Sequence, residues 1–302
     1  MVRVKPENPA ITAWTQSAWT RADLNALLAR HGLRITVTGA RPFLNGFWNT
    51  VLHLQTDQGE LVFKHYRHAP QNPLFPNLPA EEARALTRLH GLDVAPDLVA
   101  FLPTEDVLLY RYVPGTEWQD GWADAAHLLR RQSGADPAGF RRVPTTSAAI
   151  LAQGDRILAT CRPDATTGLL RSSRPNAQDS DPAPLSLIHT DPAPANLIGQ
   201  GPGLRLIDWQ CPAAGDLAED VAILFSPAFL TLYNRPLPSL AQRQVFLQTL
   251  DDPALTARLP ALEPAYAWRL ACYCAHRAQT APDPALAQRY RDAALTFPTD
   301  PW

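Results

Sequence analysis

The spacing of hydrophobic positions changes near the start of the chain. Residues 13–32 place Trp, Ala and Leu at helical spacing after a polar start, which predicts an N-terminal helix. Three short runs follow that are either β-branched or alternating, separated by turns that contain Gly, Asn or Asp: "LRITVTGA", "NTVLHLQTD" and "GELVFKHYR". With "TDQGE" as a hairpin connection, these runs predict an antiparallel sheet.

The pattern then becomes mainly helical. "LPAEEARALTRLHG" favours a helix with acidic residues in its first turn and a glycine near its end. Two strand candidates follow, "DLVAFLP" and "DVLLYRYVPG", before the Pro114–Gly115 pair breaks the chain. In the rest of the chain the hydrophobic residues recur at helical spacing, apart from "PLSLIHTD" and "GLRLIDWQ". Residues 162–184 show no such spacing, so a mobile connection is expected there.

These elements predict an α+β protein with two lobes. A small lobe, residues 1–111, holds the antiparallel sheet and one important helix. A larger lobe, residues 112–302, is mainly helical.

Composition narrows the classes of function. The net charge of −2 gives the chain no excess of basic residues, which argues against a nucleic-acid partner. No apolar run approaches the ~18 residues of a membrane span, so no membrane partner and a cytoplasmic location are expected. The four cysteines form no CxxC pair and are interpreted as buried free thiols without chemistry.

Lysine is rare in this chain. Of 27 cationic residues only Lys5 and Lys64 are lysine, and Lys64 lies inside the strand-like "ELVFKHY". An ammonium is a compact charge that reaches phosphate oxygens between packed elements, where a planar guanidinium is too wide. An ordinary surface lysine is the alternative interpretation.

One loop collects a histidine, a carboxylate and a carboxamide. "LIHTDPAPANLIG" places His189, Asp191 and Asn196 in the pattern H-x-D-x-x-x-x-N, and "LRLIDWQ" presents Asp208 at the end of the next apolar run. Phosphoryl transfer from ATP needs a lysine for the phosphates and a helix carboxylate to hold it. It also needs an Asp to orient a hydroxyl, and an Asn and a second Asp for Mg²⁺. All five groups occur in this order, which predicts a kinase.

Long stretches of the chain resemble the aminoglycoside phosphotransferase and choline kinase family. "LIHTDPAPANLIGQGPGLRLIDWQCPAAGDLAEDVA" is similar to the family's signature region, with its His-x-Asp loop, "IDW" strand and "GD…D" segment. "LNGFWNTVLHLQTDQGELVFKHY" resembles its nucleotide-covering hairpin and lysine strand, "EEARALTRLHGLDVAPDLV" its glutamate helix, and "LLYRYVPG" its hinge. The resemblance covers about residues 35 to 225 and implies a protein-kinase-like fold; the residues after it resemble nothing in particular.

In the larger lobe, the resemblance implies Asp191 as the catalytic base, with Asn196 and Asp208 on magnesium. His189 would pack and hydrogen-bond to hold the loop, as an ordinary buried histidine also does. Asp220 would accept hydrogen bonds from the loop backbone, and a helix-start carboxylate is the alternative.

In the small lobe, the resemblance implies that Lys64 binds the α- and β-phosphates of ATP. Glu82 is the expected partner of Lys64, and Glu81 takes its place if the helix is rotated. The remaining contacts to ATP are expected from the hairpin and the hinge: Gly46, Asn49, Arg111 and Val113.

Two residues of the catalytic loop depart from the family's pattern. Thr190 stands where a Gly is usual, and Pro192 where a larger apolar residue is usual. A stiffer loop is expected, with every reacting group still present.

Other functions fit the sequence less well. No GxxxxGK[ST] motif occurs, which excludes a P-loop kinase. Only "WQCPAAGDLAE" separates Asp208 from Asp220, which leaves no peptide platform for a protein kinase. A metal-dependent hydrolase would need a second His-rich element. A non-catalytic nucleotide-binding protein with this fold remains the alternative, although it would not need a base at position 191.

The phosphoryl acceptor is expected to be a small hydroxyl compound held by the C-terminal helices, where the family places its substrate pocket. Residues 197–302 carry 10 acidic residues against 8 arginines, a poor match for a polycationic aminoglycoside. Tyr266 and Tyr273, with Glu263 one turn before, either bind a monocation such as choline or pack in the core. Two arginines of the same segment suggest instead an anionic or sugar-like acceptor: Arg269 and Arg277.

Overall fold

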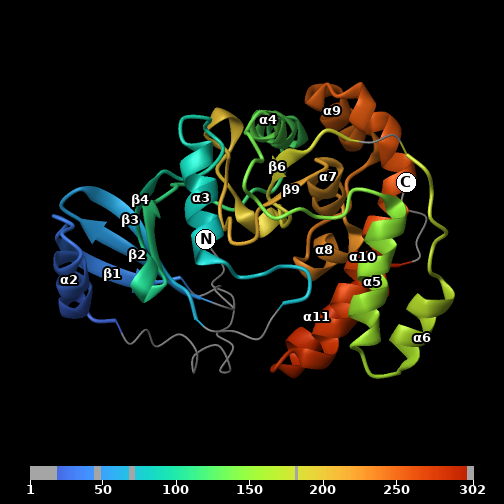
Figure 1. Ribbon diagram of the computed structural model, residues 1–302, viewed down its shortest axis with the longest axis horizontal. Helices are drawn as coiled ribbons and strands as arrows, with labels where there is room; N and C mark the ends of the chain where they lie inside the picture. The colour runs from blue at the N-terminus through green and yellow to red at the C-terminus, as the bar shows by residue number, and fades with distance from the viewer. Residues whose placement is uncertain (1–18, 44–48, 68–71, 181–182, 298–302) are drawn as a thin grey trace, which may run out of the picture.

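The computed structural model describes residues 19–43, 49–67, 72–180 and 183–297, and it divides into a sheet lobe and a helical lobe (Figure 1). The sheet lobe contains α2 (Arg21–Arg30), β1 (Val37–Pro42), β2 (Thr50–Thr56), β3 (Gly59–His65), α3 (Pro79–Leu89), β4 (Leu98–Leu102) and β5 (Val107–Arg111).

The helical lobe carries four very short strands among its helices. Its helices are α4 (Trp122–Ser133), α5 (Ser147–Ala159), α6 (Ala165–Ser172), α7 (Ala218–Leu224), α8 (Pro227–Leu232), α9 (Leu240–Leu250), α10 (Pro253–Thr280) and α11 (Pro284–Ala294). Its strands are β6 (Ser186–Ile188), β7 (Leu197–Ile198), β8 (Arg205–Leu206) and β9 (Ala213–Gly215), paired as β6–β9 and β7–β8. The α+β, two-lobed prediction is confirmed.

The five-stranded sheet is antiparallel, with the order β1-β2-β3-β5-β4. β3 is therefore an inner strand, and its side chains alternate between the two faces of the sheet. Leu61 and Phe63 pack in the small core that α2 covers, whereas Val62 and Tyr66 belong to the larger core that includes α3. Lys64 lies two residues from both Val62 and Tyr66, so its side chain points to the same face of the sheet, toward α3.

α2 is shorter in the described residues than the helix expected over residues 13–32. Thr20 and Asp23 form a capping box, in which each side chain accepts a hydrogen bond from the other residue's backbone N–H. This cap fixes the start of α2 at Arg21. Residues 13–18 lie outside the described residues.

The prediction of a connection without regular structure over residues 162–184 is wrong for its first part, which forms α6. Asp164 and Thr167 form a capping box at its start, and Leu170 is fully buried. Gln279 of α10 donates a hydrogen bond of 2.9 Å to the Asp164 carboxylate, so α6 is held from outside as well. A helix of eight residues has too few turns to show a clear period in the sequence.

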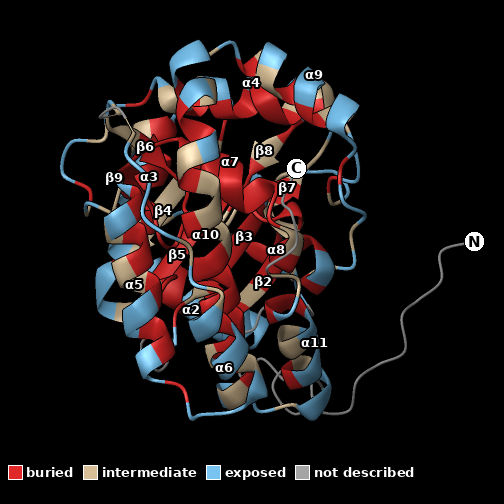
Figure 2. Ribbon diagram, turned by 90° about the vertical axis from the view of Figure 1, so that its right-hand side faces the viewer, coloured by how far each residue is buried: buried red, intermediate tan, exposed pale blue. Residues whose placement is uncertain are grey.

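The long helix α10 lies in the middle of the helical lobe and contacts α5, α6, α7, α8 and α11. Figure 2 shows buried positions along α7 and α10, and exposed positions on the outer faces of α5, α9 and α11. Trp268 and Arg269 of α10 are fully buried. No helix among the described residues is long and apolar enough to cross a membrane.

The contact between α5 and α10 leaves no room for a side chain at Gly154. A Cβ atom added at Gly154 would lie 2.5 Å from Cζ3 of Trp268. Gly154→Ala is therefore expected to destabilise the protein by about 1–3 kcal/mol, because the buried indole must shift. The matched control is Gly168→Ala in α6, where an added Cβ meets nothing within 4 Å. It should raise stability slightly through helix propensity, and thermal unfolding of both variants measures the difference.

Candidate active site

Lys64 lies between two carboxylates at the junction of the lobes. Its Nζ lies 2.5 Å from Oε2 of Glu82 on α3, and it also donates a hydrogen bond to the carboxylate of Asp208. The partner on α3 is Glu82, whereas Glu81 pairs with Arg84 on the surface of the same helix. The side chain of Lys64 is only 3% exposed, so this lysine is no ordinary surface residue.

The electrostatics favour a charged lysine. Burial by itself lowers the pKa of Lys64, but the carboxylates of Asp208 and Glu82 outweigh it and hold the pKa well above its ordinary value. Burial also raises the pKa of Glu82, and Lys64 opposes that rise. Tyr66, two residues after Lys64 on the same face, donates its hydroxyl to Glu82. Tyr66 has no distinguishing sequence signal apart from its spacing of two residues from Lys64.

The predicted catalytic loop, residues 189–196, follows β6, and His189 is its buried anchor. Nε2 of His189 donates to the backbone carbonyl of Ile207 at 3.0 Å, and Nδ1 accepts from the N–H of Asp191 at 3.2 Å. Burial lowers the pKa of His189 to about 4, so the imidazole is neutral at pH 7 and carries its proton on Nε2. His189 thus connects the loop to the residue just before Asp208.

Asp220, in the first turn of α7, accepts hydrogen bonds from the same loop. Its carboxylate receives the backbone N–H groups of His189 and Thr190, both at 2.8 Å, and the side-chain amide of Gln132 at 2.5 Å. Burial raises the pKa of Asp220 to about 7 against the effect of these donors. Gln132 lies 88 residues from Asp220 in the chain, so this contact has no local sequence signal.

Removing one acceptor from this cluster should weaken the loop. Asp220→Asn turns one carboxylate oxygen into an NH₂ group that faces a backbone or amide donor, so we expect a loss of about 1–3 kcal/mol of stability. The matched control is Asp136→Asn, which removes a charge from an ion pair whose Asp side chain is 66% exposed. Its effect should stay within about 0.5 kcal/mol. Thermal unfolding of the two variants tests this difference.

Asp191 has a buried carboxylate oxygen without a partner. Among the described residues, nothing hydrogen-bonds to its Oδ1, which is buried. Burial, and then the charges of Asp208 and Asp220, raise the pKa of Asp191 well above its ordinary value. Asn196 donates from Nδ2 to the backbone carbonyl of Asp191 at 2.9 Å, which closes the loop. A buried acceptor of raised basicity is what a general base for a hydroxyl proton needs.

Asp208 and Asn196 lie on two segments that are bonded to each other, since the backbone N–H of Ile207 donates to the backbone carbonyl of Asn196 at 2.9 Å. Asp208 follows β8 with a left-handed backbone (φ 66°), and its side chain is 37% exposed. Because Nδ2 of Asn196 is bonded to Asp191, Oδ1 of Asn196 is the atom left for a cation. No group of three or more His, Cys, Asp or Glu residues in the described part could hold a metal alone. This donor set fits Mg²⁺, which is usually bound by one or two carboxylates together with substrate phosphates.

The covering hairpin and the hinge are described in part. Gly46 lies outside the described residues. Asn49 is buried, and its amide exchanges hydrogen bonds with Asn77 and donates to Gln210 at 3.2 Å, so it ties the hairpin to the segment after Asp208.

In the hinge, the backbone N–H of Arg111 donates to Asp97 and that of Tyr112 to Glu60. Val113 makes no hydrogen bond among the described residues, so its backbone N–H is the hinge donor available to a base.

The aromatic and charged residues of α10 pack in the core. Tyr266 is fully buried with the guanidinium of Arg269 over its ring, and Tyr273 is 5% exposed and accepts a hydrogen bond from Asn72. Glu263 pairs with Arg243. Of the two interpretations of Tyr266 and Tyr273, core packing is therefore the one found. Arg269 is likewise structural, because Glu219 binds it at 2.8 Å.

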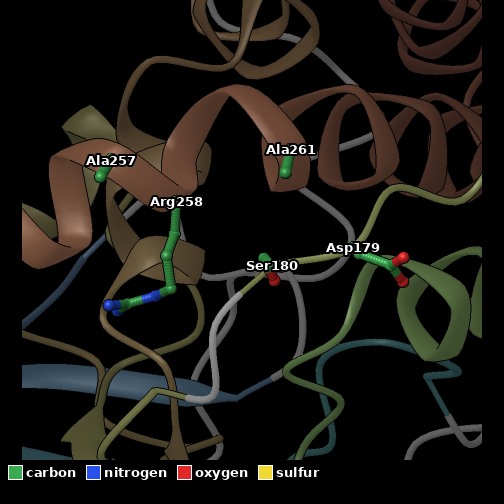
Figure 3. Close-up of a pocket in the computed structure, with 5 residues that line it drawn as sticks. All are labelled: Asp179, Ser180, Ala257, Arg258 and Ala261. Atoms are coloured by element: carbon green, nitrogen blue, oxygen red, sulfur yellow. The ribbon is translucent and has the colours of Figure 1, made fainter.

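A polar cavity of about 360 Å³ lies elsewhere, between α10 and the segment that leads to β6 (Figure 3). It is lined by Asp179, Ser180, Ala257, Arg258 and Ala261. Arg258 donates a hydrogen bond to Asp216, which directly follows β9. The last residue of β9, Gly215, pairs with the first residue of β6, Ser186. The catalytic loop follows the opposite end of β6, so this cavity belongs to another part of the lobe.

Comparison with known proteins gives one family and a set of related folds. The sequence matches the family described as "Phosphotransferase enzyme family" (APH) over residues 39–262. The match extends to residue 262, so the expectation that the residues after 225 resemble nothing in particular is corrected for residues 226–262. No curated protein matches the sequence.

Three solved structures illustrate the fold. A choline/ethanolamine kinase family protein from Mesorhizobium loti is 19% identical, with a TM-score of 0.66, and covers 96% of both chains. The macrolide 2'-phosphotransferase MphH from Brachybacterium faecium is 19% identical, with a TM-score of 0.61 over 92% of this chain and 99% of that one. The choline kinase LicA from Streptococcus pneumoniae is 13% identical, with a TM-score of 0.62 over 92% and 99%.

Proposed function

Because this chain belongs to the phosphotransferase enzyme family, we propose that it transfers the γ-phosphate of ATP to a hydroxyl group of a small molecule, with magnesium as the cofactor. The observation that supports this most strongly is the buried, unpartnered Oδ1 of Asp191. A binding protein would have no use for such an acceptor, and an unsatisfied buried carboxylate oxygen is costly to keep.

In this mechanism Asp191 orients the acceptor hydroxyl and takes its proton. The hydroxyl would fill the vacant hydrogen-bonding position on Oδ1, and the raised pKa makes the carboxylate a better base. His189 and Asn196 keep the loop in place through their bonds to the Asp191 backbone. These contacts hold the base while the attacking oxygen approaches phosphorus.

The phosphates would be held by Lys64 and by a magnesium ion on Asp208 and Asn196. When bound, the ion offsets the charge of the phosphate oxygens. Lys64 would turn from Asp208 toward the phosphates and keep its bond to Glu82, which Tyr66 supports. The adenine base would meet Val113 in the hinge, with Gly46, Asn49 and Arg111 as further predicted contacts.

We place the boundary between the nucleotide-covering lobe and the substrate lobe after residue 111, because β5 ends at Arg111 and α4 begins the helical part. A cytoplasmic location agrees with four free, buried cysteines, since cytosolic thiols stay reduced.

The acceptor is proposed to be a small alcohol, sugar or amino alcohol rather than an aminoglycoside. Three carboxylates of the helical lobe each pair with a buried arginine: Asp216 with Arg258, Glu219 with Arg269, and Glu263 with Arg243. They are already neutralised, so they offer no attraction to a polycation.

A panel of amino alcohols, sugars, amino acids and aminoglycosides, assayed for ADP release with magnesium, tests this proposal. We expect at least one small alcohol or sugar to raise ADP release above the rate without acceptor. Turnover of kanamycin-type compounds alone would contradict the acceptor class. Tight ATP binding without any turnover would instead favour a non-catalytic nucleotide-binding protein.

A further inference from the structure

Thr190 occupies a backbone conformation that does not suit its side chain. Its φ is 66°, in the left-handed region, where a β-branched residue is strained and glycine is not. Thr190 is 2% exposed and directly precedes Asp191. A strained residue persists where surrounding contacts determine it, and such residues gather at functional sites.

The hydroxyl of Thr190 makes the contact that accompanies this strain. Oγ1 donates a buried hydrogen bond of 2.7 Å to the backbone carbonyl of Cys211, and the Thr190 N–H donates to Asp220. The guanidinium of Arg141 also donates to the Cys211 carbonyl, at 2.7 Å, and to Oγ1 of Thr190, at 3.4 Å. Glycine at this position would keep the backbone bond but lose the bond to Cys211.

The carbonyl of Cys211 belongs to the segment that carries the proposed magnesium ligand. Asp208 lies three positions earlier, also at φ 66°. Between them, Gln210 accepts from Asn49 of the sheet lobe, and its backbone carbonyl accepts from Leu78 at the start of α3. The segment 208–211 is therefore bonded to the covering hairpin, to the helix of Glu82 and, through Thr190, to the catalytic loop.

We propose that Thr190 is a positioning residue whose hydroxyl, bonded to the Cys211 carbonyl, sets the distance between Asp191 and Asp208. This inference rests on the proposed function for its effect on turnover. The hydrogen bond of the hydroxyl joins Thr190, the residue before the proposed base Asp191, to Cys211, three residues after the proposed metal ligand Asp208. The bond from His189 to Ile207 remains, but without the Thr190 bond the far end of the segment 208–211 is held less tightly. The two carboxylates then shift more easily relative to each other, which slows transfer while leaving the nucleotide contacts of Lys64 and the hinge in place.

Three variants separate the effect of the Thr190 hydroxyl from the effect of the left-handed backbone at this position. Thr190→Val keeps the shape and the strain but removes the hydroxyl, Thr190→Ser keeps the hydroxyl, and Thr190→Gly removes both the strain and the hydroxyl. We expect the Val and Gly variants to lower kcat about tenfold, because one hydrogen bond that positions the two carboxylates is lost. Their KM for ATP should stay within about twofold of the wild-type value. Ser should restore kcat to within about twofold of the wild type. Thermal unfolding should show Gly at least as stable as Val.

Hydrogen exchange tests the bond without any need for turnover. The amides of residues 207–211 and 213, which carry no substitution, should exchange faster in the Val and Gly variants and at the wild-type rate in Ser. Wild-type kcat and exchange in Thr190→Gly would overturn the proposal, because the position would then need only its backbone conformation. A Ser variant as slow as Val would overturn it as well.

The two proposals fail in different ways. If the wild type turns over no nucleotide, the proposed function is wrong, and the exchange of residues 207–211 and 213 still decides the role of Thr190. Faster exchange in both Val and Gly then supports the bond, and unchanged exchange refutes it.

Discussion

Asp191→Asn is expected to lower kcat by about 10²–10⁴-fold while leaving ATP affinity nearly unchanged. The amide has nearly the same shape but cannot accept the hydroxyl proton, so only the transition state loses an interaction. The buried Oδ1 without a partner and the raised pKa both support the proposal that this carboxylate is the base. Steady-state kinetics with an acceptor from the panel, together with ATP titration calorimetry, measure the two quantities separately.

The control for this change is Asp155→Asn. Asp155 pairs with Arg174 at the surface, and its side chain is 48% exposed, so the same loss of charge should leave kcat unchanged. Full turnover by Asp191→Asn would show that another group takes the proton.

Lys64→Arg is expected to lower kcat/KM for ATP by about 10²-fold although the charge is kept. The side chain is 3% exposed, it bonds two carboxylates, and its ammonium lies 4.9 Å from the centre of the Tyr66 ring. A longer planar guanidinium cannot occupy this space without displacing Glu82 or the phosphates. Kinetics at varied ATP concentration check the prediction.

Arg30→Lys makes the reverse exchange at an exposed ion pair with Glu105, and it should change kcat/KM by less than about twofold. Equal kcat/KM for Lys64→Arg and the wild type would mean that this lysine does not contact the nucleotide.

The elements and residues that could be predicted from the sequence share one property: their signal is local. The strands β2 and β3 are short runs rich in β-branched and apolar residues, and α3 combines acidic residues in its first turn with apolar residues at helical spacing. The loop from His189 to Asn196 and the strand before Asp208 are short and follow one another closely. Their order along the chain is by itself an indication of phosphoryl transfer.

What could not be predicted depends on contacts between distant parts of the chain. Asn49 meets Gln210 across 161 residues, and Gln132 meets Asp220 across 88. Such partners are chosen by packing, and a single glutamine in a sequence has no distinguishing signal. α6 has no clear sequence signal for a related reason: its eight residues are too few to show a helical period, and the helix is stabilised by its capping box and by contact with α10.

Transfer of labelled phosphate from γ-labelled ATP, by the wild type and by Asp191→Asn with and without magnesium, tests the central claim most directly. The account predicts label in a small hydroxyl compound, dependent on magnesium, and at least a hundredfold slower in the variant. Equal labelling by both proteins, or labelling that does not require magnesium, would contradict it.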